Sequence, residues 1–246
     1  MRRLAPLVSA LLLAAATAAA DDTILAVTPT WPAEWPMDPA PLTGARWPEL
    51  PPPLSPLPAA TPAAARILET LARVQATQRD IAYQHRTAVN ERLGRYRWDC
   101  SGMVSWVMRR AAPRAGRAMR SERLAARGIH RMIERAPLDH PRAGWQRLAH
   151  IEEVRPGDVF AWRTPAGSPS RHTGHTGFVV ERPRPVPGLR DAYAVRVADS
   201  IVGPHQDDTG VFGFLTDGEG HATHYGWHGT RTAGYMRTPI LFGRLH

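Results

Sequence analysis

The sequence contains one cysteine, Cys100, and no lysine. A single cysteine cannot form a disulfide within the chain, although exported proteins normally use their cysteines in pairs. Cys100 is therefore expected to be either a buried core residue or a reactive thiol. Every basic residue is an arginine, and the arginines are scattered without the stripe typical of a nucleic-acid surface. The formal charge of +9 thus does not indicate nucleic-acid binding.

Long hydrophobic runs are missing after the N-terminus. Residues 1–20 combine Arg2 and Arg3 with an apolar run and the small residues Ala18 to Ala20, which predicts a cleaved signal peptide. The alternative is an uncleaved anchor, but the run is shorter than the ~20 residues of a membrane-spanning helix. We expect a soluble, monomeric protein, periplasmic or secreted, without stable membrane insertion after cleavage.

A proline-rich arm is predicted over residues 21–61. Residues 29–62 hold twelve of the 24 prolines, which excludes a helix or a central strand there. Trp31, Trp35 and Trp47 lie in the same stretch. The arm is therefore expected to be either a flexible spacer or a segment that packs on the domain, which would comprise residues 62–246.

The order of predicted elements indicates an α+β domain. Thr61 and Pro62 are typical of a helix start, and apolar spacing predicts a helix to Leu93, ended by Gly94. Further helices are expected from Cys100 and over 116–135. Later segments read as strands: 158–162, 175–181, 193–201, 211–215 and 238–245. Helices first and strands later predict a helical half on an antiparallel sheet.

The residues around Cys100 favour a nucleophile over a structural cysteine. Asp99 can cap the helix that begins there, and a helix N-terminus stabilises a thiolate. A histidine could complete the ion pair. His175, which starts a strand between glycines, is preferred over His172 in the preceding loop. Asp199 ends the next strand and could orient the imidazole; the alternatives are His205 and Asp207.

Three segments resemble the NlpC-type cell-wall cysteine peptidases, which have a papain-like fold. Asp99–Gly102 resembles the nucleophile motif, Val154–Phe160 the Pro-Gly-Asp strand entry, and Gly174–Val180 the histidine strand. The motifs follow the order of the family. The resemblance implies a papain-like α+β domain that cleaves amide bonds of peptidoglycan peptides, with Cys100 as nucleophile and His175 as base.

Four residues next to the nucleophile are expected to bind substrate: Tyr96, Trp98, Asp99 and Ser101. The chain departs from the family pattern in three ways. The glycine-rich stretch often found before the nucleophile is replaced by residues 94–98, Gly-Arg-Tyr-Arg-Trp. The third catalytic residue would be Asp199 where histidine is common, and about 40 residues (111–149) separate the nucleophile helix from the Pro-Gly-Asp turn. No metal and no cofactor is expected.

Other interpretations remain open. His221, His224 and His228, with His205 and Asp207 upstream, could hold zinc, although the glycines around them indicate a loop. A non-catalytic envelope-binding module could retain the fold. A papain-like acyltransferase or an amidase on a non-peptidoglycan substrate is the third alternative.

Overall fold

The structure is a computed structural model that describes residues 54–120, 124–164, 166, 172–185, 193–200, 215–216, 219–220 and 240–246. The predicted signal peptide and the tryptophans of the arm lie outside these residues. So do His205, Asp207 and the histidines at 221, 224 and 228, so the expectations about them stay predictions.

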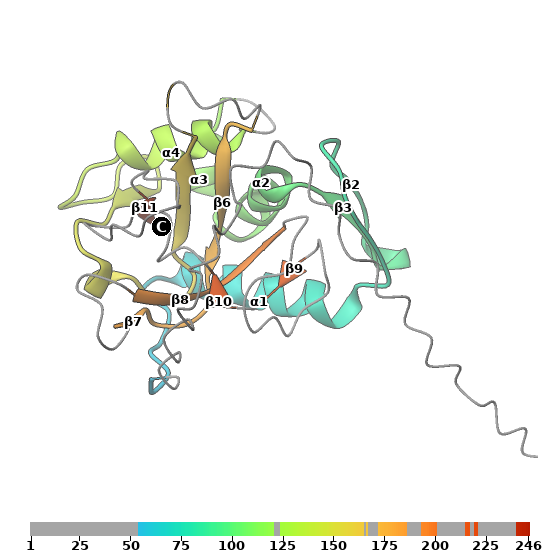
Figure 1. Ribbon diagram of the computed structural model, residues 1–246, viewed down its shortest axis with the longest axis horizontal. Coiled ribbons are helices and arrows are strands. Elements are labelled where there is room, and N and C mark those ends of the chain that lie inside the picture. The colour runs from blue at the N-terminus through green and yellow to red at the C-terminus, as the bar shows by residue number, and fades with distance from the viewer. Residues whose placement is uncertain are drawn as a thin grey trace, which may run out of the picture. The chain divides into compact units, whose positions relative to one another are not determined.

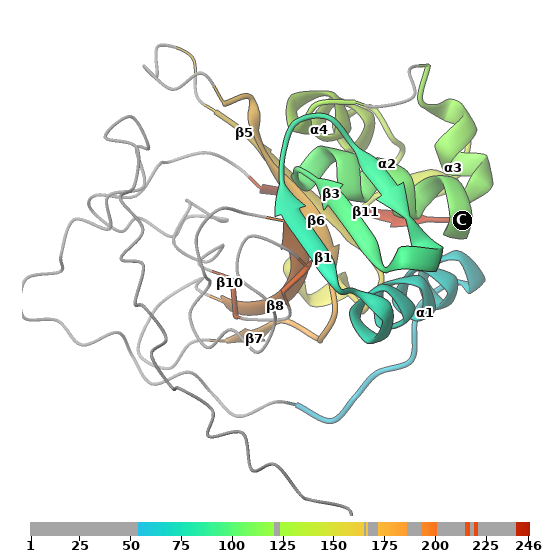
Figure 2. The ribbon, with the colours of Figure 1, turned by 90° about the vertical axis from the view of Figure 1, so that its right-hand side faces the viewer.

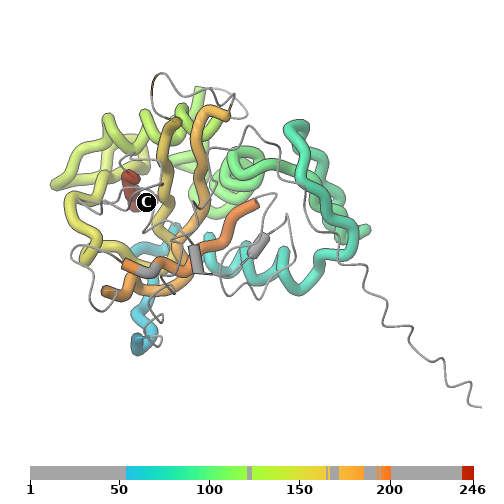
Figure 3. The backbone as a smooth tube through the Cα atoms, in the orientation of Figure 1, coloured from blue at the N-terminus to red at the C-terminus, as the bar shows by residue number. Residues whose placement is uncertain are grey.

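An antiparallel sheet forms the centre of the described chain (Figure 1). Its main order is β10-β8-β6-β5-β11-β4, and β7 and β9 also pair with β8. The strands have these bounds: β4 Trp145–Arg147, β5 Val159–Arg163, β6 Gly174–Val179, β7 Arg184–Pro185, β8 Tyr193–Ser200, β9 Leu215–Thr216, β10 Glu219–Gly220 and β11 Ile240–Leu245. The C-terminal strand β11 thus lies between β5 and β4, two strands that come from the middle of the sequence (Figure 3).

Four α-helices precede these strands: α1 Pro62–Thr77, α2 Cys100–Ala111, α3 Pro113–Ala118 and α4 Ala126–Glu134. They lie together on one side of the sheet (Figure 2). Their apolar side chains form one core with Val159, Ala161 and Phe178 of the sheet. Phe160 and Trp162 point to the opposite face, where a second cluster includes side chains near the short helix η2, Ile151–Glu153. The mixed α+β class with an antiparallel sheet is therefore confirmed.

The prediction of one helix from Pro62 to Leu93 was correct only for its first half. Thr61 caps the helix as expected, since its hydroxyl accepts from the amide of Ala64 at 3.0 Å. The helix ends at Thr77, and the chain continues as β1 Asp80–Tyr83, β2 Ala88–Asn90 and the 3₁₀ turn η1 Glu91–Leu93.

Tertiary pairing explains why the helix stops early. β1 pairs in parallel with β3, Arg95–Trp98, and β2 pairs with β3 antiparallel. Asp80 accepts from Arg95 at 2.6 Å and from Arg97 at 2.9 Å, which ties β1 to β3. These pairings outweigh the apolar spacing that also fits a helix. Gly94 keeps a local role, ending η1 with φ of 62°.

The predicted helix over 116–135 is replaced by α3 and α4, with residues 121–123 outside the description. The strands expected near 158–162, 175–181, 193–201 and 238–245 are present as β5, β6, β8 and β11. Of the segment 211–215, only Leu215 is described, as the start of β9. Among the described residues, none of the helices is both long and apolar enough to cross a membrane.

A buried ion pair fastens the Pro-Gly-Asp turn before β5. Asp158 is fully buried, and its carboxylate accepts from Arg244 of β11 at 2.9 and 3.1 Å. Burial raises the pKa of Asp158, while Arg244 opposes this rise. Gly157, with φ of 90°, brings the turn against Ala64 of α1, where a Cβ would lie 2.6 Å from the carbonyl oxygen. The turn therefore joins α1, β5 and β11.

Replacing Arg244 by alanine would leave the Asp158 carboxylate buried without its cation. We expect the free energy of unfolding to fall by about 3–5 kcal/mol, as when other buried pairs are broken. Urea denaturation at neutral pH measures the loss. Arg95→Gln is the matched control, because its pair with Asp80 is exposed to water and should matter far less. Equal losses of unfolding free energy in the two variants would show that Arg244 does not hold the Pro-Gly-Asp turn through Asp158.

Candidate active site

The N-terminus of α2 carries Cys100 as its first residue. One carboxylate oxygen of Asp99 accepts from the backbone amide of Gly102 at 2.8 Å and from the Ser101 hydroxyl at 2.9 Å. This cap fixes the first turn, as the sequence predicts. The Cys100 side chain is thereby held in the positive potential of the helix start, with 7 % of the residue exposed.

His175 and Asp199 come from the neighbouring strands β6 and β8. His175 Nε2 lies 2.7 Å from the Asp199 carboxylate, which is completely buried. The pairing of Phe178 with Ala198 brings Asp199 over Gly177, on the face of β6 that also carries His175. The period-2 placement of Asp199 in the sequence is thus realised as a contact.

Cys100 also acts on His175, since its charge and its hydrogen bonding contribute to the raised pKa of the imidazole. Nε2 is directed at Asp199, which leaves Nδ1 for the sulfur and the substrate. Burial acts to lower the pKa of His175, but the charges of Asp199 and Cys100 and the hydrogen bonds to both outweigh it and raise the pKa to about 10. His175 is therefore protonated at neutral pH. A histidine next to a cysteine is the partner that a cysteine nucleophile requires.

Aromatic rings enclose the imidazole. The ring centroids of Phe160 and Trp162 on β5 lie 5.9 and 6.2 Å from that of His175. They limit the access of water to the His175–Asp199 pair and thereby strengthen it. The structure thus brings together Cys100, His175 and Asp199, the three residues expected to be catalytic.

The residues expected to bind substrate are placed differently. Tyr96 and Trp98 are 1 % and 0 % exposed, and their rings lie in the main core. The Tyr96 hydroxyl is 2.9 Å from the Thr77 hydroxyl. We therefore assign these two side chains to the core and not to a substrate surface. Asp99 and Ser101 are also buried, and the structure shows them capping α2.

Two histidines outside the three-residue set have clear positions. His172 is exposed in the segment before β6. His85, which sequence reasoning missed, places Nδ1 3.0 Å from the second carboxylate oxygen of Asp99. No local motif could have revealed it, since His85 lies in the connection between β1 and β2.

The described residues contain no group of three side chains suited to hold a metal. No protein-family model, no curated protein and no solved structure matches this chain. The chemical interpretation of the site therefore rests on its own geometry.

Gly177→Ala tests the space between β6 and β8. A Cβ at residue 177 would lie 2.7 Å from Asp199 Cβ and 2.8 Å from a Phe160 ring carbon. We expect a loss of about 1–3 kcal/mol, as for overpacked cores, together with a longer His175–Asp199 contact in the variant's crystal structure.

Gly128→Ala in α4 is the matched control. Its new Cβ would meet only the Leu124 side chain, at 3.2 Å, and alanine favours a helix by up to about 1 kcal/mol. Wild-type stability in Gly177→Ala would contradict the packing argument.

The pH dependence of stability tests the His175–Asp199 pair. Folding raises the pKa of His175 from its ordinary value of 6.5 to about 10. The resulting stabilisation is complete below pH 6.5 and is lost as the pH rises through 10. Asp199→Asn removes the carboxylate charge and lowers this pKa, so the variant should lose less stability across that window.

The measurement is urea unfolding at a series of pH values from 6.5 to 10. Asp139→Asn, which removes a charge from an exposed pair with His140, should show the wild-type dependence of the unfolding free energy on pH. The same pH dependence in Asp199→Asn and wild type would show that Asp199 does not set the pKa of His175.

Proposed function

We propose that this protein is a cysteine-dependent amide hydrolase, a peptidase or amidase with a papain-like domain, that acts on peptides of the cell wall. One observation carries the proposal: the Cys100 thiol begins a helix and acts electrostatically on His175, which a buried Asp199 holds at 2.7 Å. A nucleophile, a base and an orienting acid in this order form a catalytic triad.

The surrounding fold supports the same interpretation. The nucleophile helix packs on an antiparallel sheet whose adjacent strands supply the histidine and the acid. That arrangement is the one implied by the resemblance to the NlpC-type family. The Pro-Gly-Asp turn of the resemblance is also a structural feature here, since Asp158 joins it to β11.

The proposed reaction begins from the pair in which His175 has taken the proton of the Cys100 thiol, and the sulfur attacks the amide carbonyl. A C–S bond forms, the carbonyl π electrons move to oxygen, and the backbone N–H of Cys100 at the helix start donates to the oxyanion. His175, protonated at neutral pH, then gives its proton to the amine nitrogen as the C–N bond breaks.

Water completes the cycle. Neutral His175 takes a proton from a water molecule, whose oxygen attacks the thioester carbonyl. The C–S bond breaks, the acid product leaves, and the thiolate–imidazolium pair returns. Asp199 keeps Nε2 of His175 in place throughout, so that Nδ1 faces sulfur and substrate.

The substrate class rests on sequence features. The predicted signal peptide supports a location in a periplasm or outside the cell, where peptidoglycan peptides are accessible. The three resembling motifs indicate the same substrate. We propose a monomeric, secreted or periplasmic enzyme that requires no cofactor and no nucleic acid.

Cys100→Ala should abolish turnover. We expect kcat/KM to fall by more than about 1,000-fold, as when a nucleophile is removed, with stability changed by about 1 kcal/mol or less. The assay incubates the purified protein with peptidoglycan and with soluble muropeptides and detects the released amines by mass spectrometry. Asp199→Asn should retain more activity than Cys100→Ala, since Asp199 only orients the base.

His172→Gln is the matched control for His175→Gln. His172 precedes β6 and is exposed, whereas His175 contacts the sulfur. We expect near wild-type activity in the first variant and none in the second. Amine release at the same rate by wild type and Cys100→Ala would refute the hydrolase. Transfer of the acyl group to an added amine without hydrolysis would favour the acyltransferase.

A further inference from the structure

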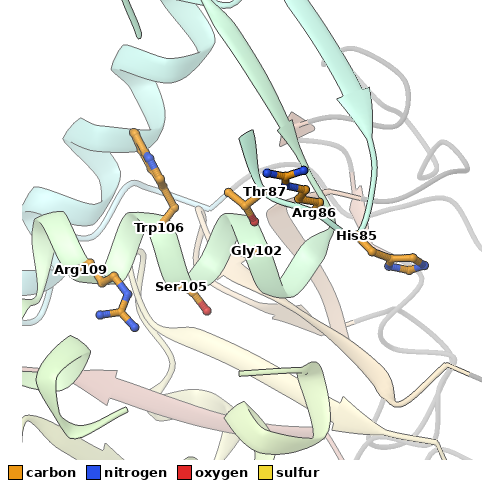
Figure 4. A pocket seen from close by; sticks show the side chains of 7 residues that line it. All are labelled: His85, Arg86, Thr87, Gly102, Ser105, Trp106 and Arg109. Carbon is orange, nitrogen blue, oxygen red and sulfur yellow. The ribbon is translucent and has the colours of Figure 1, made fainter. Parts of the chain in front are cut away.

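A pocket of about 470 Å³ lies on α2, beside the part of the core that Trp106 joins. Gly102, Ser105, Trp106 and Arg109 line it from the helix, and their i, i+3, i+4, i+7 spacing gives one continuous strip. The other wall is the connection from His85 to Thr87 between β1 and β2 (Figure 4). Its volume is in the range of roughly 300–1,000 Å³ typical of small-molecule sites.

Two hydroxyl groups in the pocket lining are buried. Ser105 is 3 % exposed, and neither its Oγ nor Thr87 Oγ1 has a hydrogen-bond partner among the described residues. Gly102 allows Thr87 to come this close, since a Cβ there would lie 2.3 Å from the Thr87 oxygen. Buried hydroxyls without partners are uncommon. Both oxygens have almost no accessible surface, so a ligand in the pocket can satisfy them only when Thr87 and Ser105 turn to another rotamer.

The charge of the lining is positive. Arg86 and Arg109 are exposed at its rim, His85 lies near the N-terminal end of α2, and no acidic residue is among the described lining residues. Asp99 adjoins the lining residue His85, with one carboxylate oxygen 3.0 Å from His85 Nδ1, while its other oxygen accepts from the Gly102 amide. Guanidinium and hydroxyl groups are suited to carboxylate or phosphate oxygens.

Trp106 supplies a flat apolar wall. The Arg110 guanidinium lies 3.7 Å from its ring centroid and is itself held by Glu91 at 2.8 Å. Tyr96 and Trp98 of the core also pack against the indole, with ring centroids 6.1 and 5.4 Å away. The indole is thereby fixed in place, and the part of it that lines the pocket can contact the carbon skeleton of a ligand whose anionic group meets the arginines.

We propose that this pocket binds a small ligand with a carboxylate or phosphate group, at a site separate from the Cys100–His175–Asp199 set. Arg86 and Arg109 attract the anion, Thr87 and Ser105 donate hydrogen bonds to it after a change of rotamer, and Trp106 contacts its apolar part. The site does not depend on the proposed hydrolase activity, because Cys100 and His175 do not line it.

Isothermal titration at constant ionic strength tests the site with three probes: sodium phosphate, sodium glutarate and the uncharged glutaramide. We expect one of the two anions to bind and glutaramide not to bind. Because exposed arginines are screened by salt, binding should weaken as chloride is raised. Tighter binding of glutarate would identify the ligand group as a carboxylate, and tighter binding of phosphate would identify it as a phosphate.

Variants connect the binding to the pocket. The double variant Arg86→Gln/Arg109→Gln should bind the preferred anion at least about tenfold more weakly, and Ser105→Ala should bind it several-fold more weakly. Arg117→Gln on α3, an exposed arginine outside the pocket, is the control for loss of a surface charge, matched to each single variant, and should bind as wild type does. Cys100→Ala should also bind normally.

Three results would overturn the site: no binding of either anion, equal binding of glutaramide, or equal losses in Arg117→Gln and the double variant. Circular dichroism of each variant confirms its fold. Both rim arginines are exposed, so the single variants Arg86→Gln and Arg109→Gln provide the same test if the double variant is unstable.

Discussion

The buried carboxylate of Asp199 imposes the constraint on which the active-site half of the molecule depends. A carboxylate removed from water must be compensated by a cation and by hydrogen bonds. His175 supplies both at 2.7 Å and is held protonated, with its pKa raised to about 10. The contact requires β8 to pass close to β6 at Gly177, where no larger side chain fits. The register of β6 and β8 and the glycine at residue 177 therefore both serve the contact that keeps His175 protonated.

Helix α2 carries two different surfaces. Its first residue, Cys100, is directed to His175, while Ser105, Trp106 and Arg109 line a pocket with the β1–β2 connection. Asp99 lies between the two, since one of its oxygens caps the helix and the other faces His85. The proposed hydrolase and the proposed anion site are consequently separable by mutation, although they share the same helix terminus.

Local patterns predicted the parts of the structure that depend on adjacent residues. The Thr61 cap, the start of α2 at Cys100 with its Asp99 cap, and the strands β5, β6, β8 and β11 all follow the sequence reading. The second half of the predicted long helix was wrong. Residues 80–83 have helical spacing, but parallel pairing with β3 decides their conformation, and no pattern within those four residues records the partner strand.

The sequence by itself determined where α2 begins, which face of β8 carries Asp199, and which residue is the sole thiol. Tertiary structure decided that Tyr96 and Trp98 belong to the core, that His85 meets Asp99 across 14 residues, and that Thr87 reaches Gly102. Caps and strand alternation act within a few residues and are visible in the sequence. Contacts between distant segments depend on strand pairing and on how closely two backbones can approach, and these are fixed only when the whole sheet and its helices pack together.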